Sequence, residues 1–437
     1  MNLKIEKNRT LLVDGPASVT ITSGKAQVFS TTILSPRRIV IREGKRLPFA
    51  VEENAVFEIS AGEKARIEEI AGNTCPPSWT RAYEELLKIE NNPVTAVIVG
   101  AAGSGKTSFC TFLANGLVNE RHKVAIIDGD LGQSDIGPPS TVAYNVVTKP
   151  LTDLFSLKAK NAVFVGATSP GTAIEKVVSG LTTLKEEVLV HNPDYIIIDT
   201  DGWTNGECAV DYKLKLVEKL CPNVVFCIQQ KDELMPLLNV LREFKSVQVE
   251  YPSAIKERDK ENRRSLRELG YQKYLRNTKV QSLPLNWLKI EDDALFGLGK
   301  GREDVRRARR IYELLGMKPL HYAEINDRII IVVGKKKWIA SENLKKLEEF
   351  TRKEIEIIRT GEEEGLVTAL YGSGGKFLGI GVLLGIDYVR KALKIMTPVT
   401  EEISSVAIGK VRLDKNMKEI PSLEEEPIDF TSLKKLF

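Results

Sequence analysis

The stretch TAVIVGAAGSGKT, residues 95–107, decides the fold of the central part of the chain. Its first five residues are mostly apolar and have the composition of a strand that is buried on both faces. Residues 100–107 fit the pattern G-x-x-x-x-G-K-[ST] of a phosphate-binding loop. The helix-like run TSFCTFLANGL begins at the end of this loop. We therefore expect a phosphate site where a buried strand leads into a helix.

Each residue type in this loop has a physical reason to bind a nucleotide phosphate or its metal ion. Glycines let backbone N–H groups curl around phosphate oxygens, and the helix N-terminus adds partial positive charge. Lys106 is expected to reach the β- and γ-phosphates, and Thr107 to ligate Mg²⁺ through its hydroxyl. The residues predicted to bind the nucleotide are Gly100, Ala101, Ala102, Gly103, Ser104, Gly105, Lys106, Thr107 and Ser108.

The same strand pattern recurs along the middle of the chain. Near-continuous apolar segments lie at residues 123–127, 162–165, 195–198 and 224–228, with helix-length segments between them. Apolar strands that alternate with helices indicate a parallel sheet covered on both faces. The predicted fold class is α/β, a doubly wound parallel sheet formed by a P-loop domain over residues 76–290.

The two ends of the chain read differently. Residues 1–75 hold short alternating segments punctuated by glycines, which predicts an N-terminal β-sandwich-like domain. Residues 291–437 hold a basic helix near 303–315 and several strands, which predicts a mixed, mainly β, C-terminal α+β domain. The glycine-rich turn at 372–376 is expected to close a hairpin.

Composition excludes several classes of protein. Hydrophobic residues make up 42% of the 437-residue chain and charged residues 28%, which rules out a disordered chain. No run approaches the roughly 18 apolar residues that span a bilayer, and the N-terminus lacks the apolar region of a signal peptide. Five irregularly spaced cysteines argue against a disulfide framework. We expect a soluble, intracellular, cytoplasmic protein.

Charge adds little to this description. The net charge of +4 is too near balance to diagnose nucleic-acid binding by itself. The heavy use of Lys, Arg and Glu is compatible with a thermophilic source.

Acidic side chains follow two of the predicted strands. The segment DGDLGQ, 128–133, leaves one strand and DTDGW, 199–203, leaves another. The carboxyl ends of parallel strands meet at the edge of the sheet where α/β proteins bind ligands. One of Asp128 and Asp130 can join the magnesium shell while the other faces an acceptor. Asp199 is a second candidate for the metal shell.

Two further segments can reach the same edge. The segment ATSPG, 167–171, could hold a phosphate with its N–H groups and hydroxyls, or could be a plain connection. Residues 256–274 are strongly basic and helical in pattern. Beside a phosphate loop, a lid that carries arginines over the phosphates is a better interpretation than a solvated helix. Arg263 and Arg267 share a helix face, and Arg258 joins them only if the helix begins after it.

Together these segments resemble the polynucleotide 5′-hydroxyl kinase family of RNA processing. The family includes a subunit of the pre-mRNA 3′-end cleavage factor, a ribosomal RNA processing kinase and archaeal relatives, and the resemblance suggests an archaeal member. Its motifs are the phosphate loop, DxDxGQ, a clasp of form TxGW and an arginine-bearing lid. Here they fall on residues 100–107, 128–133, 200–203 and 258–267. The resemblance extends to the layout, with a small β domain before the kinase core and another domain after it.

The resemblance implies ATP-dependent transfer of the γ-phosphoryl group to the 5′-hydroxyl of RNA, possibly also of DNA, with Mg²⁺ or another divalent cation. Asp130 would accept the proton of the attacking hydroxyl, and Thr107 and Asp128 would hold the metal. The catalytic residues that it implies are Lys106, Asp130, Arg258, Arg263 and Arg267. Those implied to bind the acceptor are Gln133, Ser169, Pro170, Thr200, Gly202 and Trp203. Trp203 is either a stacking plate for a base or sugar, or a core aromatic residue. Arg264 replaces Arg263 if the register shifts by one.

Two other functions are compatible with a phosphate loop. A P-loop ATPase of the partitioning or protein-targeting type usually has an extra lysine early in the loop, where this chain has Ala101 and Ala102. A guanine-reading NKxD motif is missing after residues 224–228, where QQKDE follows, which favours ATP over GTP. A non-catalytic, ATP-holding scaffold of an RNA-processing complex is the other alternative.

Overall fold

The computed structural model describes residues 1–255, 259–291, 298, 305–325 and 328–421. Contacts divide the chain into two compact units, Met1–Gly270 and Tyr271–Phe437. Each unit is described separately below. The boundaries of the three predicted domains, 1–75, 76–290 and 291–437, stay predictions.

The first 71 residues form a seven-stranded antiparallel sheet that bends back on itself. The long strands β3 and β6 run side by side, and the start of β3 pairs with β5 whereas its end pairs with β4. Alternate side chains along β3 are buried, as expected for strands with one face on a core. The strands are β1 (Asn2–Ile5), β2 (Arg9–Asp14), β3 (Ala17–Val28), β4 (Thr31–Leu34), β5 (Arg37–Ile41), β6 (Arg46–Ala61) and β7 (Ile67–Ala71).

The middle of the first unit is a second seven-stranded sheet, in the order β11-β10-β9-β12-β8-β13-β14. The α/β class predicted from the sequence is confirmed, with one addition. Strand β10 pairs antiparallel with both of its neighbours, because no helix lies between β9 and β10 to carry the chain across the sheet. The strands are β8 (Val94–Gly100), β9 (Val124–Gly129), β10 (Thr141–Val147), β11 (Asn161–Phe164), β12 (Tyr195–Thr200), β13 (Val224–Ile228) and β14 (Ser246–Val249).

Helices cover both faces of this sheet, which explains why its strands are apolar throughout. Val97 and Val99 of β8 pack against the helices of one face, in one core with α3, α4 and α5. On the other face, Phe109 of α2 contacts Trp79 of α1 and Phe226 of β13. The helices are α1 (Pro77–Leu87), α2 (Lys106–Asn119), α3 (Ile174–Val188), α4 (Glu207–Leu220), α5 (Met235–Val240) and α6 (Lys260–Tyr274). Three 3₁₀ turns lie in the connections: η1 (Leu154–Ser156) between β10 and β11, η2 (Pro170–Thr172) before α3, and η3 (Leu189–His191) after it.

The second unit contains a seven-stranded sheet and a three-stranded sheet. The hairpin predicted at 372–376 is present, since β20 and β21 pair antiparallel on either side of it. The strands of the seven-stranded sheet are β15 (Lys279–Pro284), β16 (Lys289–Glu291), β20 (Leu366–Tyr371), β21 (Phe377–Asp387), β22 (Ala392–Thr397), β23 (Ser405–Leu413) and β24 (Glu419–Ile420). The 3₁₀ turns η4 (Leu285–Trp287) and η5 (Ser373–Gly375) lie between them. Strand β15 pairs with β22, although its residues were assigned to the middle domain.

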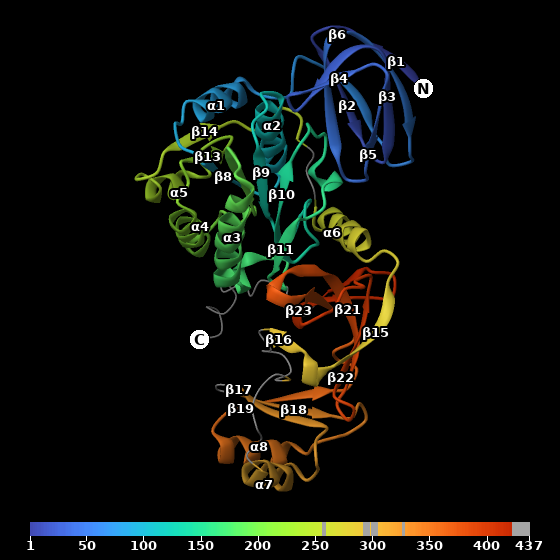
Figure 1. Cartoon of the computed structure of the whole chain (residues 1–437), viewed down its shortest axis with the longest axis vertical. Helices are drawn as coiled ribbons and strands as arrows, with labels where there is room; N and C mark the ends of the chain where they lie inside the picture. The colour runs from blue at the N-terminus through green and yellow to red at the C-terminus, as the bar shows by residue number, and fades with distance from the viewer. Residues whose placement is uncertain (256–258, 292–297, 299–304, 326–327, 422–437) are drawn as a thin grey trace, which may run out of the picture. The chain divides into compact units, whose positions relative to one another are not determined.

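Helices α7 (Val305–Leu315) and α8 (Ser341–Thr351) cover one face of the three-stranded sheet, β17 (His321–Ile325), β18 (Arg328–Val333) and β19 (Glu354–Arg359) (Figure 1). Among the described residues, we find no helix with the length and apolar character needed to cross a membrane.

Candidate active site

A cavity of about 430 Å³ opens at the carboxyl ends of β8, β9 and β12. It brings together most of the residues predicted for the site. Those that line it are Ala102, Gly103, Gly105, Lys106, Thr107, Ser108, Asp130, Gln133, Ser169, Pro170, Gly202, Trp203, Arg263 and Arg267. The predicted residues that lie outside the lining are Gly100, Ala101, Ser104, Asp128, Asp199 and Thr200. Arg258 lies outside the described residues.

The phosphate loop holds Lys106 at its centre. Gly103 and Gly105 have φ of 84° and 94°, a region that favours glycine, and Gly105 is the residue before α2. The Lys106 ammonium donates to the carbonyl oxygens of Gly100 and Ala101, both at 2.9 Å. Burial lowers the pKa of Lys106, and the neighbouring carboxylates oppose that shift. The Lys106 ammonium therefore already lies within the loop that is expected to bind a phosphate.

Asp128 organises the loop that follows β9. One carboxylate oxygen accepts from the backbone N–H groups of Asp135 at 2.7 Å and Ile136 at 3.0 Å, and from the Ser134 hydroxyl at 3.1 Å. The other accepts from the backbone N–H of Asp130 at 3.2 Å. Burial and the nearby carboxylate of Asp199 raise the pKa of Asp128 to about 8. These contacts fix the conformation of the loop. That Asp128 binds a metal stays a prediction.

Asp199 is the carboxylate that contacts Thr107, the threonine predicted to ligate Mg²⁺. Its Oδ2 accepts from the Thr107 hydroxyl at 2.7 Å. Its Oδ1 is buried and has no hydrogen-bond partner among the described residues. An orphaned buried oxygen beside a hydroxyl fits a hard cation that takes only one or two protein ligands and completes its shell with phosphates and water. Within the described part of the chain, no cluster of three or more His, Cys, Asp or Glu side chains is placed to hold a metal ion.

We expect Asp199→Asn to stabilise the metal- and nucleotide-free protein at pH 8 but not at pH 5. Burial raises the pKa of Asp199 to about 7, whereas an unfolded Asp titrates near about 3.9. The wild-type stability that comes from the protonated carboxyl is complete below about pH 4 and is lost as the pH rises through 7. The amide does not titrate, so the variant's advantage should grow by about 1.4 kcal/mol per pH unit over this window.

Urea unfolding at pH 5, 6, 7 and 8 measures this difference. Asp211→Asn, at an exposed position of α4, is the control. A gap between Asp199→Asn and wild type that stays constant with pH would contradict the expectation.

Asp130 lies in the cavity wall. Its Oδ1 accepts from the backbone N–H groups of Gly132 at 3.0 Å and Gln133 at 2.9 Å. Burial raises the pKa of Asp130, and the charge of Lys106 opposes the shift. A carboxylate with a raised pKa is a better proton acceptor than a free Asp.

The clasp segment after β12 touches the phosphate loop directly. A Cβ on Gly202 would lie 2.5 Å from the Cα of Ala102, so a side chain cannot fit there. The Thr200 hydroxyl donates to the carbonyl oxygen of Ile98 in β8 at 2.8 Å and is fully buried. Thr200 therefore holds the clasp to the strand that precedes the loop. Trp203 lines the cavity, and its ring stacks on Tyr212 with the centroids 5.6 Å apart.

A buried ion pair beneath the clasp was not predicted. The fully buried Lys213 ammonium donates to Asp201 Oδ2 and to the Asp201 carbonyl oxygen, both at 2.9 Å. The Tyr212 hydroxyl donates to the same Oδ2 at 2.7 Å, and the backbone N–H of Trp203 donates to Oδ1 at 2.9 Å. The sequence did contain a signal, because Lys213 falls on the buried face of α4 beside Leu216 and Val217.

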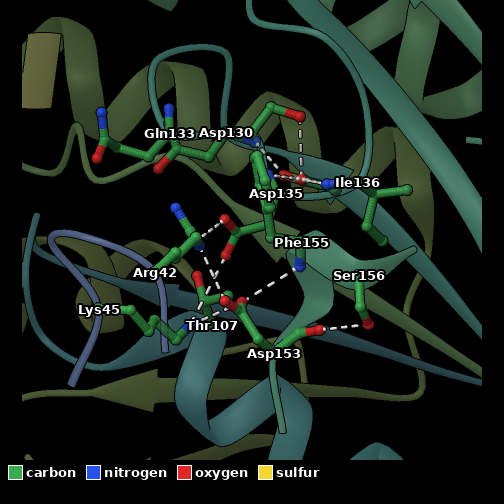
Figure 2. A network of polar contacts seen from close by, with 12 residues as sticks. Arg42, Lys45, Thr107, Asp130, Gln133, Asp135, Ile136, Asp153, Phe155 and Ser156 are labelled. Atoms are coloured by element: carbon green, nitrogen blue, oxygen red, sulfur yellow. Dashed lines mark hydrogen bonds and ion pairs between the residues drawn. The ribbon is translucent and has the colours of Figure 1, made fainter. Parts of the chain in front are cut away.

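The N-terminal sheet contributes basic residues to the cavity wall (Figure 2). Arg42 pairs with Asp135 of the loop after β9 and, at 2.9 Å, with Asp153 before η1. Lys45 contacts Asp153 at 3.2 Å. These cations hold the pKa of Asp153 well below its usual range despite its burial, and the Arg42 guanidinium lies 4.3 Å from the centre of the Phe155 ring. No motif or periodicity marks these residues in the sequence.

Helix α6 supplies the arginines of the predicted lid. Arg263 and Arg267 line the cavity, one helical turn apart. Arg264 instead pairs with Glu268 at 3.2 Å. The structure thus places Arg263, and not Arg264, at the cavity.

Residues 100–277 match the family model described as the mRNA cleavage and polyadenylation factor CLP1 P-loop. The polyribonucleotide 5′-hydroxyl-kinase of Pyrococcus abyssi is 28% identical, over 82% of this chain and 98% of its own length. That of Methanocaldococcus jannaschii is 28% identical, over 78% and 93% respectively. A solved Clp1p–Pcf11p complex superimposes with a TM-score of 0.65 at 14% identity, covering 94% of this chain and 97% of that one. Over its P-loop region and over most of its length, the chain is thus similar to CLP1 proteins and to polyribonucleotide 5′-hydroxyl-kinases.

Proposed function

We propose that the protein is a polyribonucleotide 5′-hydroxyl kinase that transfers the γ-phosphoryl group of ATP to the 5′-hydroxyl end of RNA. The observation that carries the proposal is one cavity lined by the phosphate-loop lysine Lys106, the carboxylate of Asp130 and the arginines of α6. Archaeal relatives that align over most of the chain bear the name of this activity. DNA is a further possible acceptor, and a cytoplasmic location stays a prediction.

In the proposed phosphoryl transfer, each side chain of the cavity has a separate role. The 5′-hydroxyl oxygen of the acceptor forms a bond to the γ-phosphorus as the bond to the bridging β–γ oxygen breaks, and ADP leaves. The proton of the hydroxyl passes to Asp130. Because the transition state is loose, the protein's main work is to align the nucleophile and balance charge on the phosphoryl oxygens. Lys106, Arg263 and Arg267 supply that positive charge.

We propose Thr107 and Asp199 as the protein ligands of Mg²⁺. The orphaned Asp199 Oδ1 supports this assignment more than it supports Asp128, whose oxygens accept four hydrogen bonds from the loop after β9. When bound, the cation would neutralise charge on the β- and γ-phosphates.

Incubation with γ-labelled ATP and a 5′-hydroxyl oligoribonucleotide tests the proposal. Label on the oligonucleotide supports the kinase. Release of phosphate alone would point to an ATPase, and binding without turnover would point to a scaffold. A DNA oligonucleotide of the same sequence measures the preference for the 2′-hydroxyl.

We expect Trp203→Ala to raise the KM for the acceptor by about 5- to 150-fold, the loss that accompanies removal of one stacked base. The affinity for ATP should change much less, because the ring lies on the clasp rather than in the phosphate loop. Steady-state kinetics with both substrates measure the split. Trp287→Ala, at an 81% exposed position, is the control. Equal losses for acceptor and ATP would identify Trp203 as a core residue.

A further inference from the structure

We propose that the turn between β5 and β6, residues 42–45, is the seat of α6, meaning the surface that supports the helix, with Gly44 as a positioning residue for Arg263 and Arg267. The inference rests on the proposed function and adds a role for the N-terminal sheet in it. The sheet would hold the arginines in register with the phosphate loop.

The first observation is a direct contact between the turn and the helix. Gly44 has a φ of 75°, and a Cβ placed on it would lie 2.8 Å from Cδ2 and 3.2 Å from Cγ of Leu266. Leu266 is 9% exposed and precedes Arg267 by one residue. The turn therefore supports α6 within the same helical turn that carries both arginines. A side chain at position 44 would press on the Leu266 side chain, through which this part of the helix contacts the turn.

The second observation is an indirect link through the loop that carries Asp130. Gln133 Nε2 donates to the carbonyl oxygen of Arg263 at 3.0 Å. Two residues further along this loop, Asp135 pairs with Arg42 of the turn. Turn, helix and loop thus form a closed ring of contacts, part of which is visible in Figure 2. Displacing α6 from the turn would also disturb the loop of the proposed proton acceptor.

The third observation concerns the far end of the helix. A Cβ on Gly270 would lie 2.8 Å from Cγ of Pro139, in the segment before β10. The segment before β10 therefore contacts α6 at Gly270, four residues before the helix ends, and the N-terminal turn contacts the part that bears the arginines. Without the turn, the arginines would be fixed from one side only.

Gly44→Ala tests the proposal, with Gly72→Ala as its matched control. Both glycines belong to the N-terminal sheet region and both have a φ of 75°, so each alanine meets the same backbone strain. Among the described residues, no atom lies within 4 Å of a Cβ on Gly72. Only Gly44→Ala should push on α6. We expect it to lower kcat for transfer by about 10- to 100-fold, since misplacement of groups by about 1 Å can cost about 100-fold. Gly72→Ala should retain kcat, with a fall in Tm no larger than that of Gly44→Ala, which adds the contact with Leu266 to the same unfavourable φ.

Leu266→Ala, combined with Gly44→Ala, should lose less kcat than Gly44→Ala alone, because it removes the atoms that the new Cβ meets, but should stay below wild type because it also removes the contact with the turn. Hydrogen–deuterium exchange supplies a readout that does not depend on activity: amides of residues 260–270 should exchange faster in Gly44→Ala than in Gly72→Ala. If the two single variants match in kcat and in exchange, the seat is refuted while the kinase proposal stands. If wild type transfers no phosphate, the kinase proposal fails, and the exchange data alone decide whether the turn seats the helix.

Discussion

Lys106→Ala is expected to lower phosphoryl transfer by at least about 100- to 1,000-fold, the loss seen when one buried charge-stabilising donor is removed from an active site. The Lys106 ammonium is buried and bonded to two carbonyl oxygens of its own loop. A transferring phosphoryl group would take the place of those acceptors, so the charge is positioned before the reaction begins. The alanine variant keeps the loop glycines but loses the cation. Transfer of label at saturating ATP measures the loss.

Two variants separate this charge effect from a folding effect. Lys106→Met keeps the length of the side chain and should be as inactive as Lys106→Ala, with a Tm near that of wild type. Lys215→Ala, on the exposed part of α4 where Lys215 pairs with Glu175, should remain active. A Lys106→Met variant with near wild-type transfer would remove Lys106 from the chemistry.

Asp130→Asn should reduce transfer by about 100- to 10,000-fold, the usual range for a group that moves a proton. The variant is sharper than Asp130→Ala, because the Asn Oδ1 can still accept from the N–H groups of Gly132 and Gln133. The loop should therefore keep its shape while the proton acceptor is lost. ATP binding should be retained, and single-turnover kinetics should place the loss in the chemical step.

The pH dependence of wild type gives an independent check. Burial raises the pKa of Asp130, so the rising limb of the pH–rate profile should lie above about 3.9, the value of a free Asp. Asp130→Asn should lack this limb. If the variant transfers phosphate with an unchanged profile, another group accepts the proton.

Short-range signals in the sequence were sufficient to predict which segments meet at the cavity. The phosphate loop, the strands around it and the positions of Asp130 and Asp199 follow from residue spacing and from the rule that parallel strands end at one edge. The order of β8, β9 and β12 in the sheet places these segments together as expected. Arg263 and Arg267 also follow from helical periodicity.

Long-range contacts explain what the sequence did not reveal. Asp128 and Asp130 look equivalent in DGDLGQ, but in the structure Asp128 accepts from the N–H groups of Asp135 and Ile136, whereas Asp130 lines the cavity. Arg42 reaches the cavity from a sheet that ends before the phosphate loop begins, so local pattern carries no trace of the contact. Lys213 was detectable as a cation on an apolar helix face.

The contact between Gly202 and Ala102 limits how the acceptor end of the site can be altered. Any larger residue at position 202 would press on the backbone that has to wrap the donor's phosphates, so a change intended for one substrate would impair the other. Efforts to engineer acceptor choice should therefore leave this pair untouched. They should vary Ser169 and Pro170, whose side chains line the cavity from a separate strand connection.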